Sequence, residues 1–347
     1  MKKKISYALN VIVIVFIAFL TVKLLFGDNG LETFVHDFRK AEKSWLLVGI
    51  ILVLLFVCSE SVLIKYMLKM FDTKVPLIRC IKYSFVGFFF SYITPSASGG
   101  QPAQVFYMKK DGLKIGYSTL IMVVITFTYK LVLVLLGIVF LLLRFNQLCG
   151  YMGELVWLVI VGFVLNIAYI ILLAMLIIKP LWMRQAGIKL INLLFSVKII
   201  RNVEKYINKI NRVCDNYSVC AEYIKNNLWS IVKVLLITVF QRLCLFAVTY
   251  MVYMSYGLSG TSFVDIIAIQ AMIGIAVEML PLPGAAGVTE GCFISMYTGV
   301  FGEQLVKSAL LLSRGLSFYV VLILGAIVTA MAHIIMVRKK YAVKDEK

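Results

Sequence analysis

The run ITPSASGGQPAQVF at Ile93–Phe106 interrupts an otherwise apolar region of the sequence. It contains two prolines and two adjacent glycines, residues that break helices, and it follows an apolar segment at 77–93. A helix that breaks inside a membrane leaves amide and carbonyl groups unpaired, which is tolerated only where protein or a water-filled cavity satisfies them. We therefore predict a functional break within the membrane and not an external loop.

Composition places the chain among α-helical membrane proteins. Hydrophobic residues make up 62% of its 347 residues, against about 45–50% in soluble domains. Since a helical span takes roughly 20 apolar residues, the sequence predicts six full spans, at about 5–26, 45–68, 117–143, 154–178, 230–256 and 305–336. Two shorter apolar segments, 77–93 and 264–280, each run into a proline/glycine break. The predicted fold class is an all-α polytopic membrane protein.

The net charge of +18 is explained by orientation in a membrane. Lysine and arginine collect in cytoplasmic loops, so a nucleic-acid partner is not expected, and no nucleic-acid-binding motif is present. Basic residues place both termini, the 65–82 region and the 179–233 region in the cytoplasm. Because lysines also follow the first break, the segment 77–108 is predicted to be a re-entrant hairpin open to the cytoplasm. By the same logic, a second hairpin at 264–297 opens to the outside.

The two breaks resemble each other. The second reads LPLPGAAGVTEGCF at Leu280–Phe293, and its Pro-Gly-Ala-Ala-Gly at 283–287 matches Pro-Ser-Ala-Ser-Gly at 95–99. Matched breaks entered from opposite sides are typical of an inverted-topology repeat with a central binding site. The alternative is that these residues only allow close helix packing.

The repeat interpretation divides the chain into consecutive parts. The first repeat covers 1–143, and the second begins at 144–182 and continues at 228–337. Between them, 183–227 has the spacing of amphipathic basic helices expected on the inner leaflet. A cytoplasmic tail at 338–347 ends the chain.

The candidate site combines the breaks with charged residues at membrane depth. Helices that begin after the glycines of each break would present N–H groups to a lipid phosphate or carboxylate. Ionisable residues in spans are functional hypotheses by default, and we expect Arg314 and Arg242 to form a network with Glu278 and Glu290. Lys130 and Glu60 would be their counterpart in the first half, with the individual pairs left open. The alternative is that such pairs only hold spans together. The predicted substrate-binding residues are Thr94, Pro95, Gly99, Gly100, Gln101, Gln104, Lys130, Arg242, Glu278, Pro283, Gly284, Gly287, Thr289, Glu290 and Arg314.

Motifs for catalysis, metals and nucleotides are missing. The sequence has no GxxxxGK[ST], GxSxG or HExxH motif. Its two histidines and seven scattered cysteines form no CxxC pair. No catalytic residue, metal or cofactor is predicted.

Three stretches together resemble a known family: ITPSASGGQPAQVFYMKKDG, LPLPGAAGVTEGCF and ALLLSRGLSFYVVLILGAI, with Glu290 and Arg314 inside the last two. They are similar to the membrane domain of the lysylphosphatidylglycerol synthase/flippase family, of the multiple peptide resistance factor type. The resemblance implies a family in which a cytosolic domain moves an aminoacyl group from tRNA to phosphatidylglycerol. The membrane domain then carries the lipid to the outer leaflet and blunts cationic antimicrobial peptides. Only the membrane part is matched, so synthesis by this chain alone is not expected.

The resulting hypothesis is a flippase-like transporter that moves a phospholipid between leaflets of the bacterial cell membrane, with aminoacylated phosphatidylglycerol as one candidate. One alternative is a phosphatidylglycerol lysyltransferase-type protein acting with a separate catalytic domain. Another is a non-transporting membrane scaffold. The expected partners are membrane phospholipids, with a homodimer and a separate aminoacyl-lipid synthase as further hypotheses.

Overall fold

The structure is a computed structural model that describes residues 30–95, 97–178, 180–196, 203–204, 206–208, 210–211, 228–282 and 284–345. All elements of this described part are helical, which confirms the predicted all-α fold for it. The predicted span at 5–26, the site residue Pro283 and most of the 183–227 segment lie outside the described residues.

Four helical stretches in the described part are long and apolar enough to cross a bilayer. Two are single helices, α3 (Lys43–Met70) and α10 (Leu228–Ser255). The other two each join several elements, first α6 (Ile115–Met152), η2 (Gly153–Leu155) and α7 (Val156–Ile178), then α12 (Val288–Arg314), η3 (Gly315–Val320) and α13 (Val321–Asp345). These helices contain the segments predicted as spans from 45–68 onward, and the chain is a multi-pass membrane protein.

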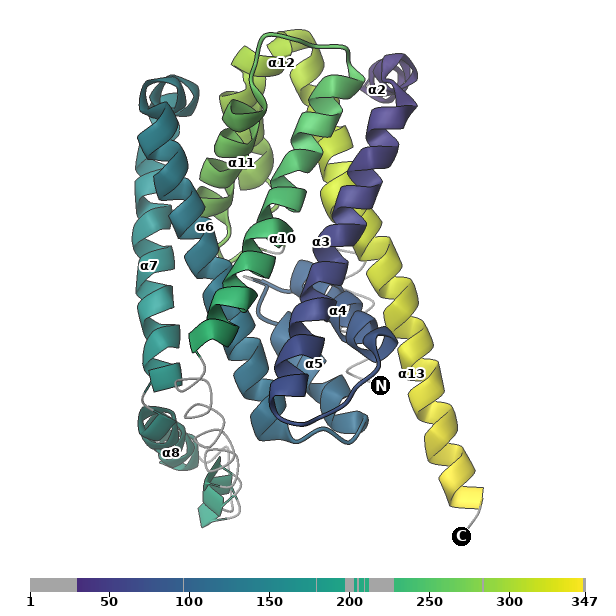
Figure 1. Cartoon of the computed structure of the whole chain (residues 1–347), viewed down its shortest axis with the longest axis vertical. Coiled ribbons are helices and arrows are strands. Elements are labelled where there is room, and N and C mark those ends of the chain that lie inside the picture. Colours follow the sequence, from purple (N-terminus) through teal and green to yellow (C-terminus); the bar gives the residue numbers. More distant parts are fainter. Residues whose placement is uncertain are drawn as a thin grey trace.

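Each break separates two helices that pack against one another. In the first half, α4 (Leu77–Tyr92) and α5 (Gly100–Lys110) flank the first break. In the second half, α11 (Phe263–Val277) and the start of α12 flank the second. In Figure 1, α4 and α5 lie in the lower half of the molecule, whereas α11 and the adjoining part of α12 lie in the upper half. The two helix pairs therefore occupy opposite ends of the bundle.

The two breaks share an unusual backbone turn. Ala97 and Ala285, which occupy the same position of the matched motif, have φ values of +54° and +50°, a region that few non-glycine residues adopt. Their N–H groups donate to the carbonyl three residues earlier, in Thr94 and Leu282. The alanine of the matched motif therefore has the same conformation and the same hydrogen bond at both places, whereas the final glycines differ, with φ −84° at Gly99 and +86° at Gly287.

The first helix pair packs closely because glycines line its contact. A Cβ atom at Gly100 would lie 2.0 Å from the Ser91 hydroxyl and 2.7 Å from the Gly87 carbonyl oxygen. A Cβ at Gly87 would lie 2.3 Å from the side-chain nitrogen of Gln104. At Gly100 the close backbone contact requires glycine, and at Gly87 a larger residue would displace the Gln104 side chain, so these glycines let α5 return directly along α4.

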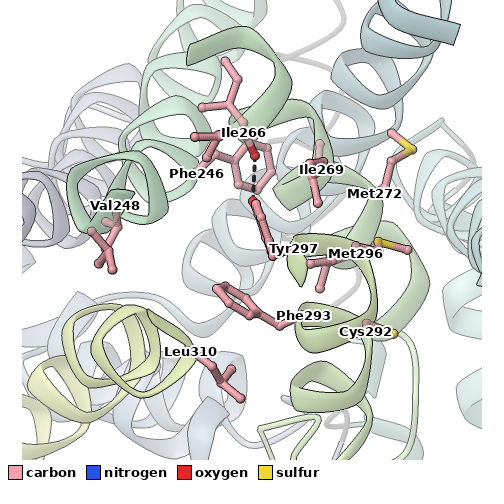
Figure 2. Close-up of a cluster of buried hydrophobic side chains, with 14 of the residues drawn as sticks. Phe246, Val248, Ile266, Ile269, Met272, Cys292, Phe293, Met296, Tyr297 and Leu310 are labelled. Atoms are coloured by element: carbon pink, nitrogen blue, oxygen red, sulfur yellow. Dashed lines mark hydrogen bonds between the residues drawn. The ribbon is translucent and has the colours of Figure 1, made fainter. Parts of the chain in front are cut away.

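The largest buried cluster joins α10, α11 and the two ends of α12, as Figure 2 shows. Phe246 of α10 and Phe293 of α12 are both 2% exposed, as expected for aromatic anchors of a core. The fully buried Tyr297 donates its hydroxyl to the Ile266 carbonyl at 2.7 Å, which satisfies the polar end of its ring. This cluster fixes α11 and the return arm of α12 as one unit.

Two short helices lie at opposite ends of the bundle in Figure 1. At one end, α2 (Gly30–Lys40) is anchored to α12 because the buried carboxylate of Asp37 accepts a hydrogen bond from Ser308. At the other end, α8 (Pro180–Ser196) includes the first residues of the segment predicted to form amphipathic basic helices. Its Arg184 donates to the side-chain oxygen of Asn211 at 2.8 Å.

The contact between α7 and α11 provides a test of the packing. A Cβ at Gly162 would lie 2.2 Å from the Ile275 carbonyl oxygen, so we expect Gly162→Ala to separate the helices. The expected loss is about 1–3 kcal/mol of stability, as for other overpacked cores. Gly150→Ala is the control, because its Cβ would meet nothing within 4 Å. Thermal unfolding of the purified protein in detergent should show a lower midpoint for Gly162→Ala alone, and equal midpoints would contradict the packing.

Candidate functional site

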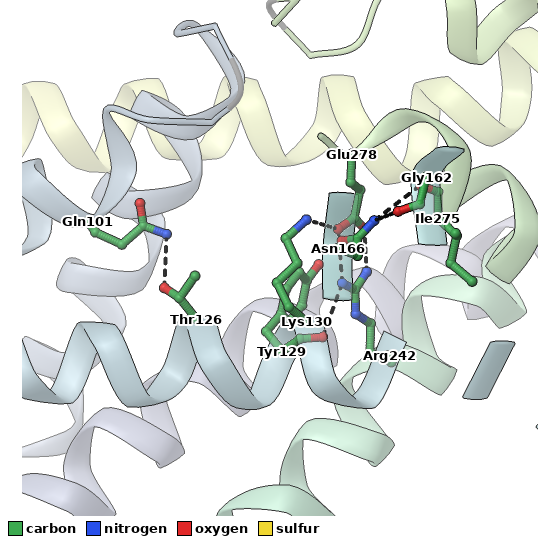
Figure 3. A network of polar contacts seen from close by, with 9 residues as sticks. All are labelled: Gln101, Thr126, Tyr129, Lys130, Gly162, Asn166, Arg242, Ile275 and Glu278. Atoms are coloured by element: carbon green, nitrogen blue, oxygen red, sulfur yellow. Dashed lines mark hydrogen bonds and ion pairs between the residues drawn. The ribbon is translucent and has the colours of Figure 1, made fainter. Parts of the chain in front are cut away.

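A buried carboxylate held by two cations lies directly before the second break (Figure 3). The Nζ atom of Lys130 on α6 donates to Glu278 Oε2 at 2.8 Å. Arg242 on α10 donates from Nη1 to Oε1 at 2.5 Å and from Nη2 to Oε2 at 3.1 Å. The three residues, called here the central triad, thus join three helices through both oxygens of one carboxylate.

Arg242 is held from a second side. Its guanidinium carbon lies 3.4 Å from the centre of the Tyr129 ring, a stacking geometry that favours arginine over lysine. Nη2 also donates to the Tyr129 carbonyl at 3.3 Å. The Arg242 side chain is 0% exposed, that of Lys130 is 10% exposed and that of Glu278 is 24% exposed. Glu278 is therefore the member of the central triad that remains reachable.

The central triad carries a surplus of positive charge. It combines two cationic side chains with one carboxylate, and no further acidic residue forms an ion pair with Lys130 or Arg242 among the described residues. Charges in a low-dielectric interior are costly unless paired. An arrangement with one uncompensated cation is therefore suited to receive an anion.

A second ion pair follows the second break. Arg314 donates from Nε to Glu290 Oε1 at 2.9 Å and from Nη2 to the Gly284 carbonyl at 3.2 Å. The other oxygen of Glu290 accepts the N–H of Gly287 at 2.6 Å. A carboxylate in the first turn of a helix compensates the positive end of its dipole. This pair is neutral and closes the start of α12.

The two breaks meet at the π-helix η3. The Tyr92 ring, at the end of α4, stacks on Phe318 with centroids 4.5 Å apart, and its hydroxyl donates to the Ser317 carbonyl at 3.2 Å. A Cβ at Gly284 would lie 2.7 Å from the Phe318 ring. Short π-helical turns are frequent at functional sites. Here the turn brings the end of α4 and the second break onto one aromatic residue.

Helix α6 contacts both breaks along one face. Gln101, just after the first break, donates to the Thr126 hydroxyl at 3.3 Å (Figure 3). Lys130 reaches the second break through Glu278, and residues four apart on a helix lie on the same side. One turn of α6 therefore connects the break regions of the two halves.

The helix starts differ from the sequence-based expectation in one respect. Helices do begin at Gly100 and Val288, as predicted. However, the N–H of Gly99 donates to the Thr94 hydroxyl at 2.8 Å, and that of Gly287 donates to Glu290. These two amides are satisfied by the chain itself and are not open to a ligand, since the Thr94 hydroxyl caps one and the Glu290 carboxylate caps the other.

The remaining predicted residues divide into two groups. Arg242, Glu278 and Lys130 come together, as do Glu290, Arg314, Gly284 and Gly287. Lys130 does not join Glu60, because Glu60 instead accepts a hydrogen bond from Gln104.

Thr289 donates to the Ala285 carbonyl at 2.9 Å, and Pro95 is exposed at the break.

Several residues of the site carry no clear sequence signal. Tyr129, Tyr92 and Phe318 are aromatic residues among many in apolar helices, and only the structure places them against Arg242 and the second break. Asn166 on α7, with 0% exposure, donates to the Ile275 carbonyl at 3.2 Å. Asn166 could have been found from the sequence, because it is a polar residue inside a predicted span. Tyr129 could have been found because it is adjacent to Lys130.

The two cations of the central triad should differ in their effect on stability. Arg242→Met removes two charge-assisted hydrogen bonds and the stacking on Tyr129, so we expect a loss on the order of 3 kcal/mol. Lys130→Met leaves a neutral Arg242–Glu278 pair and should cost about 1 kcal/mol or less. Unfolding of both variants by denaturant titration in detergent measures this order. A Lys130 variant less stable than the Arg242 variant would contradict it.

Comparison with known proteins agrees with this architecture. The chain is 25% identical over 326 residues to the UPF0104 membrane protein PH1989 of Pyrococcus horikoshii, an alignment covering 88% of this chain and 92% of that protein. A family described as the lysylphosphatidylglycerol synthase TM region matches residues 7–325. That match takes in both breaks, the central triad and the Arg314–Glu290 pair. The chain belongs to the family of the lysylphosphatidylglycerol synthase transmembrane region.

Proposed function

We propose that this chain is a flippase-like transporter that moves a phospholipid between the two leaflets of the cell membrane. The observation that carries the proposal is the surplus cation of the central triad, beside a break in a membrane helix. A lipid phosphate is an anion available at every point of the bilayer surface. Binding it would balance the charge of Lys130, Arg242 and Glu278.

The chemistry of the triad suits a phosphodiester. Arg242 uses both terminal nitrogens on Glu278 and Tyr129 and is fully buried, whereas the partly exposed Lys130 donates one hydrogen bond and has three donor hydrogens. Lys130 is therefore the cation that can take a phosphate oxygen without losing its partner. The 24% exposed Glu278 would meet a cationic group on the same headgroup.

The arrangement of the breaks supports transport over a static role. We propose that α4–α5 and α11–α12 are re-entrant hairpins of an inverted repeat, one facing each side of the membrane. The shared turn at Ala97 and Ala285 and the position of the pairs at opposite ends of the bundle support this interpretation. The basic ends of α3 and α5 favour a cytoplasmic location for the first hairpin and for both termini.

The family narrows the substrate class. Its description refers to lysylphosphatidylglycerol, a phosphodiester lipid with a cationic aminoacyl group. We propose an aminoacylated phosphatidylglycerol as the first lipid to test, with resistance to cationic antimicrobial peptides as the consequence in cells. The phosphate would lie at Lys130 and the ammonium group near Glu278.

The proposal predicts faster lipid exchange in liposomes. Fluorescent phosphatidylglycerol, with and without an aminoacyl group, should become accessible to dithionite faster with the protein than in empty liposomes. Lys130→Met should slow this rate roughly tenfold or more, because a hydrogen bond to a charged group contributes about 1.5–3 kcal/mol.

Lys65→Met is the matched control for that measurement. It removes the same charge from an exposed position of α3 that contacts neither break, so its rate should equal that of the wild type. Wild-type rates no higher than in empty liposomes, for every headgroup tried, would refute the proposed function. Equal slowing by both lysine variants would refute the role of Lys130.

A further inference from the structure

Glu60 is an acidic residue in the middle of a membrane-spanning helix. It lies ten residues before the end of α3 at Met70, which is about 15 Å along the axis at a rise of 1.5 Å per residue. That distance is half the thickness of a typical hydrocarbon core, roughly 30 Å. Ionised side chains at this depth are costly and mark functional positions.

The partners of Glu60 differ from those of Glu278 and Glu290. Its Oε1 atom accepts a hydrogen bond from Nε2 of Gln104, and within the described part of the chain no cation forms an ion pair with it. Glu278 and Glu290, by contrast, are each bound by arginine. A buried carboxylate without a cation takes up a proton in preference to remaining ionised. Glu60 is only half-buried, so a proton can reach it.

The groups that face Glu60 leave it without compensation. From α5 it meets the amide of Gln104. The cations of α6 and α10 are bound to Glu278, and the arginine before η3 is bound to Glu290.

We propose that Glu60 is a proton-binding site whose protonation state controls how firmly α5 is held, and through α5 the rate of lipid transport. The link to transport rests on the proposed function, whereas the proton site itself does not.

The hydrogen bond to Gln104 gives this site a mechanical connection. Gln104 is 4% exposed and rests on Gly87, where any larger residue would collide with its side chain. It belongs to α5, the arm that returns from the first break. The amide donates to a neutral carboxyl and, more strongly, to a carboxylate. The charge of Glu60 therefore changes how firmly α5 is held against α3.

Carbodiimide labelling tests the proton site without any transport assay. Dicyclohexylcarbodiimide modifies protonated carboxyl groups in apolar surroundings. With full-length protein in lipid nanodiscs at neutral pH, mass spectrometry should find the adduct on Glu60, decreasing as the pH rises. Glu278 and Glu290 serve as internal controls and should remain unmodified, because each is paired with an arginine. The adduct should be absent from Glu60→Gln.

Infrared difference spectroscopy covers the case in which the reagent does not reach the residue. The band of a protonated carboxyl group should be present in the wild type at neutral pH, missing from Glu60→Gln and retained in Glu154→Gln, a change in the short helix η2. An unlabelled Glu60 together with identical spectra for wild type and Glu60→Gln would overturn the proposal. Equal labelling of Glu60 and Glu278 would also overturn it.

Lipid exchange then tests the coupling. In liposomes the wild-type rate should fall as the pH rises, because ionised Glu60 binds Gln104 more strongly and restrains α5. Glu60→Gln should transport at a rate independent of pH over the same range. A variant that keeps the wild-type pH dependence refutes the coupling. Absence of transport in both proteins, with Glu60 still labelled, counts against the proposed function and leaves the proton site standing.

Discussion

The arginine–glutamate pair at the end of α11 is the interaction on which the site depends. Glu278 is the C-cap residue of α11, and a carboxylate there lies at the negative end of the helix dipole. Both burial and the dipole therefore disfavour its charge. The two cations from α6 and α10 correct both effects at once, since a cation at a helix C-terminus is favourable. The three helices must cross at this point for α11 to end where it does.

Because α11 ends inside the bundle, the residues that follow it must form a tight turn, and other contacts must hold that turn. The chain turns through Gly284, Ala285 and Gly287, all with positive φ. Glycine adopts this conformation freely, whereas the strain at Ala285 persists only where surrounding contacts hold it. Arg314 supplies one such contact at the Gly284 carbonyl, and Phe318 packs against the same glycine. The π-helical turn places Arg314 and Phe318 together on this side. The strained break, the ion pair and the irregular helix are thus parts of one structural solution.

Much of this could be predicted from the sequence because it depends on local composition. Apolar length indicates the spans, and proline and glycine indicate where α4 and α11 must stop. The recurrence of the motif at 95–99 and 283–287 even anticipates the common turn at its alanines. Charged residues in apolar helices pointed to the members of the triad.

What the sequence could not provide is the partner of each charge. Depth along a helix is local, but which side chains meet depends on how α3, α6, α10 and α11 are rotated against each other. Lys130 therefore reaches Glu278 of the other half, although Glu60 belongs to its own half. The capping of Gly287 by Glu290 is different, because it is a local contact within one helix start: the sequence predicts where α12 begins but not that its first amide is occupied. Aromatic contacts such as that of Tyr129 with Arg242 have no pattern of their own in a chain so rich in aromatic residues.

The charge balance of the two ion clusters separates structure from function. The Arg314–Glu290 pair is neutral, caps a helix and braces a strained turn, which are structural tasks complete within the chain. The central triad is not neutral. Its arginine alone satisfies both oxygens of Glu278, so the lysine is a second cation without a carboxylate of its own. Lys130 therefore adds a charge beyond the one that neutralises Glu278, and its side chain is 10% exposed. A cation in excess of charge neutrality, at the point where α6 connects both breaks, is suited to a site for an anion that binds and leaves.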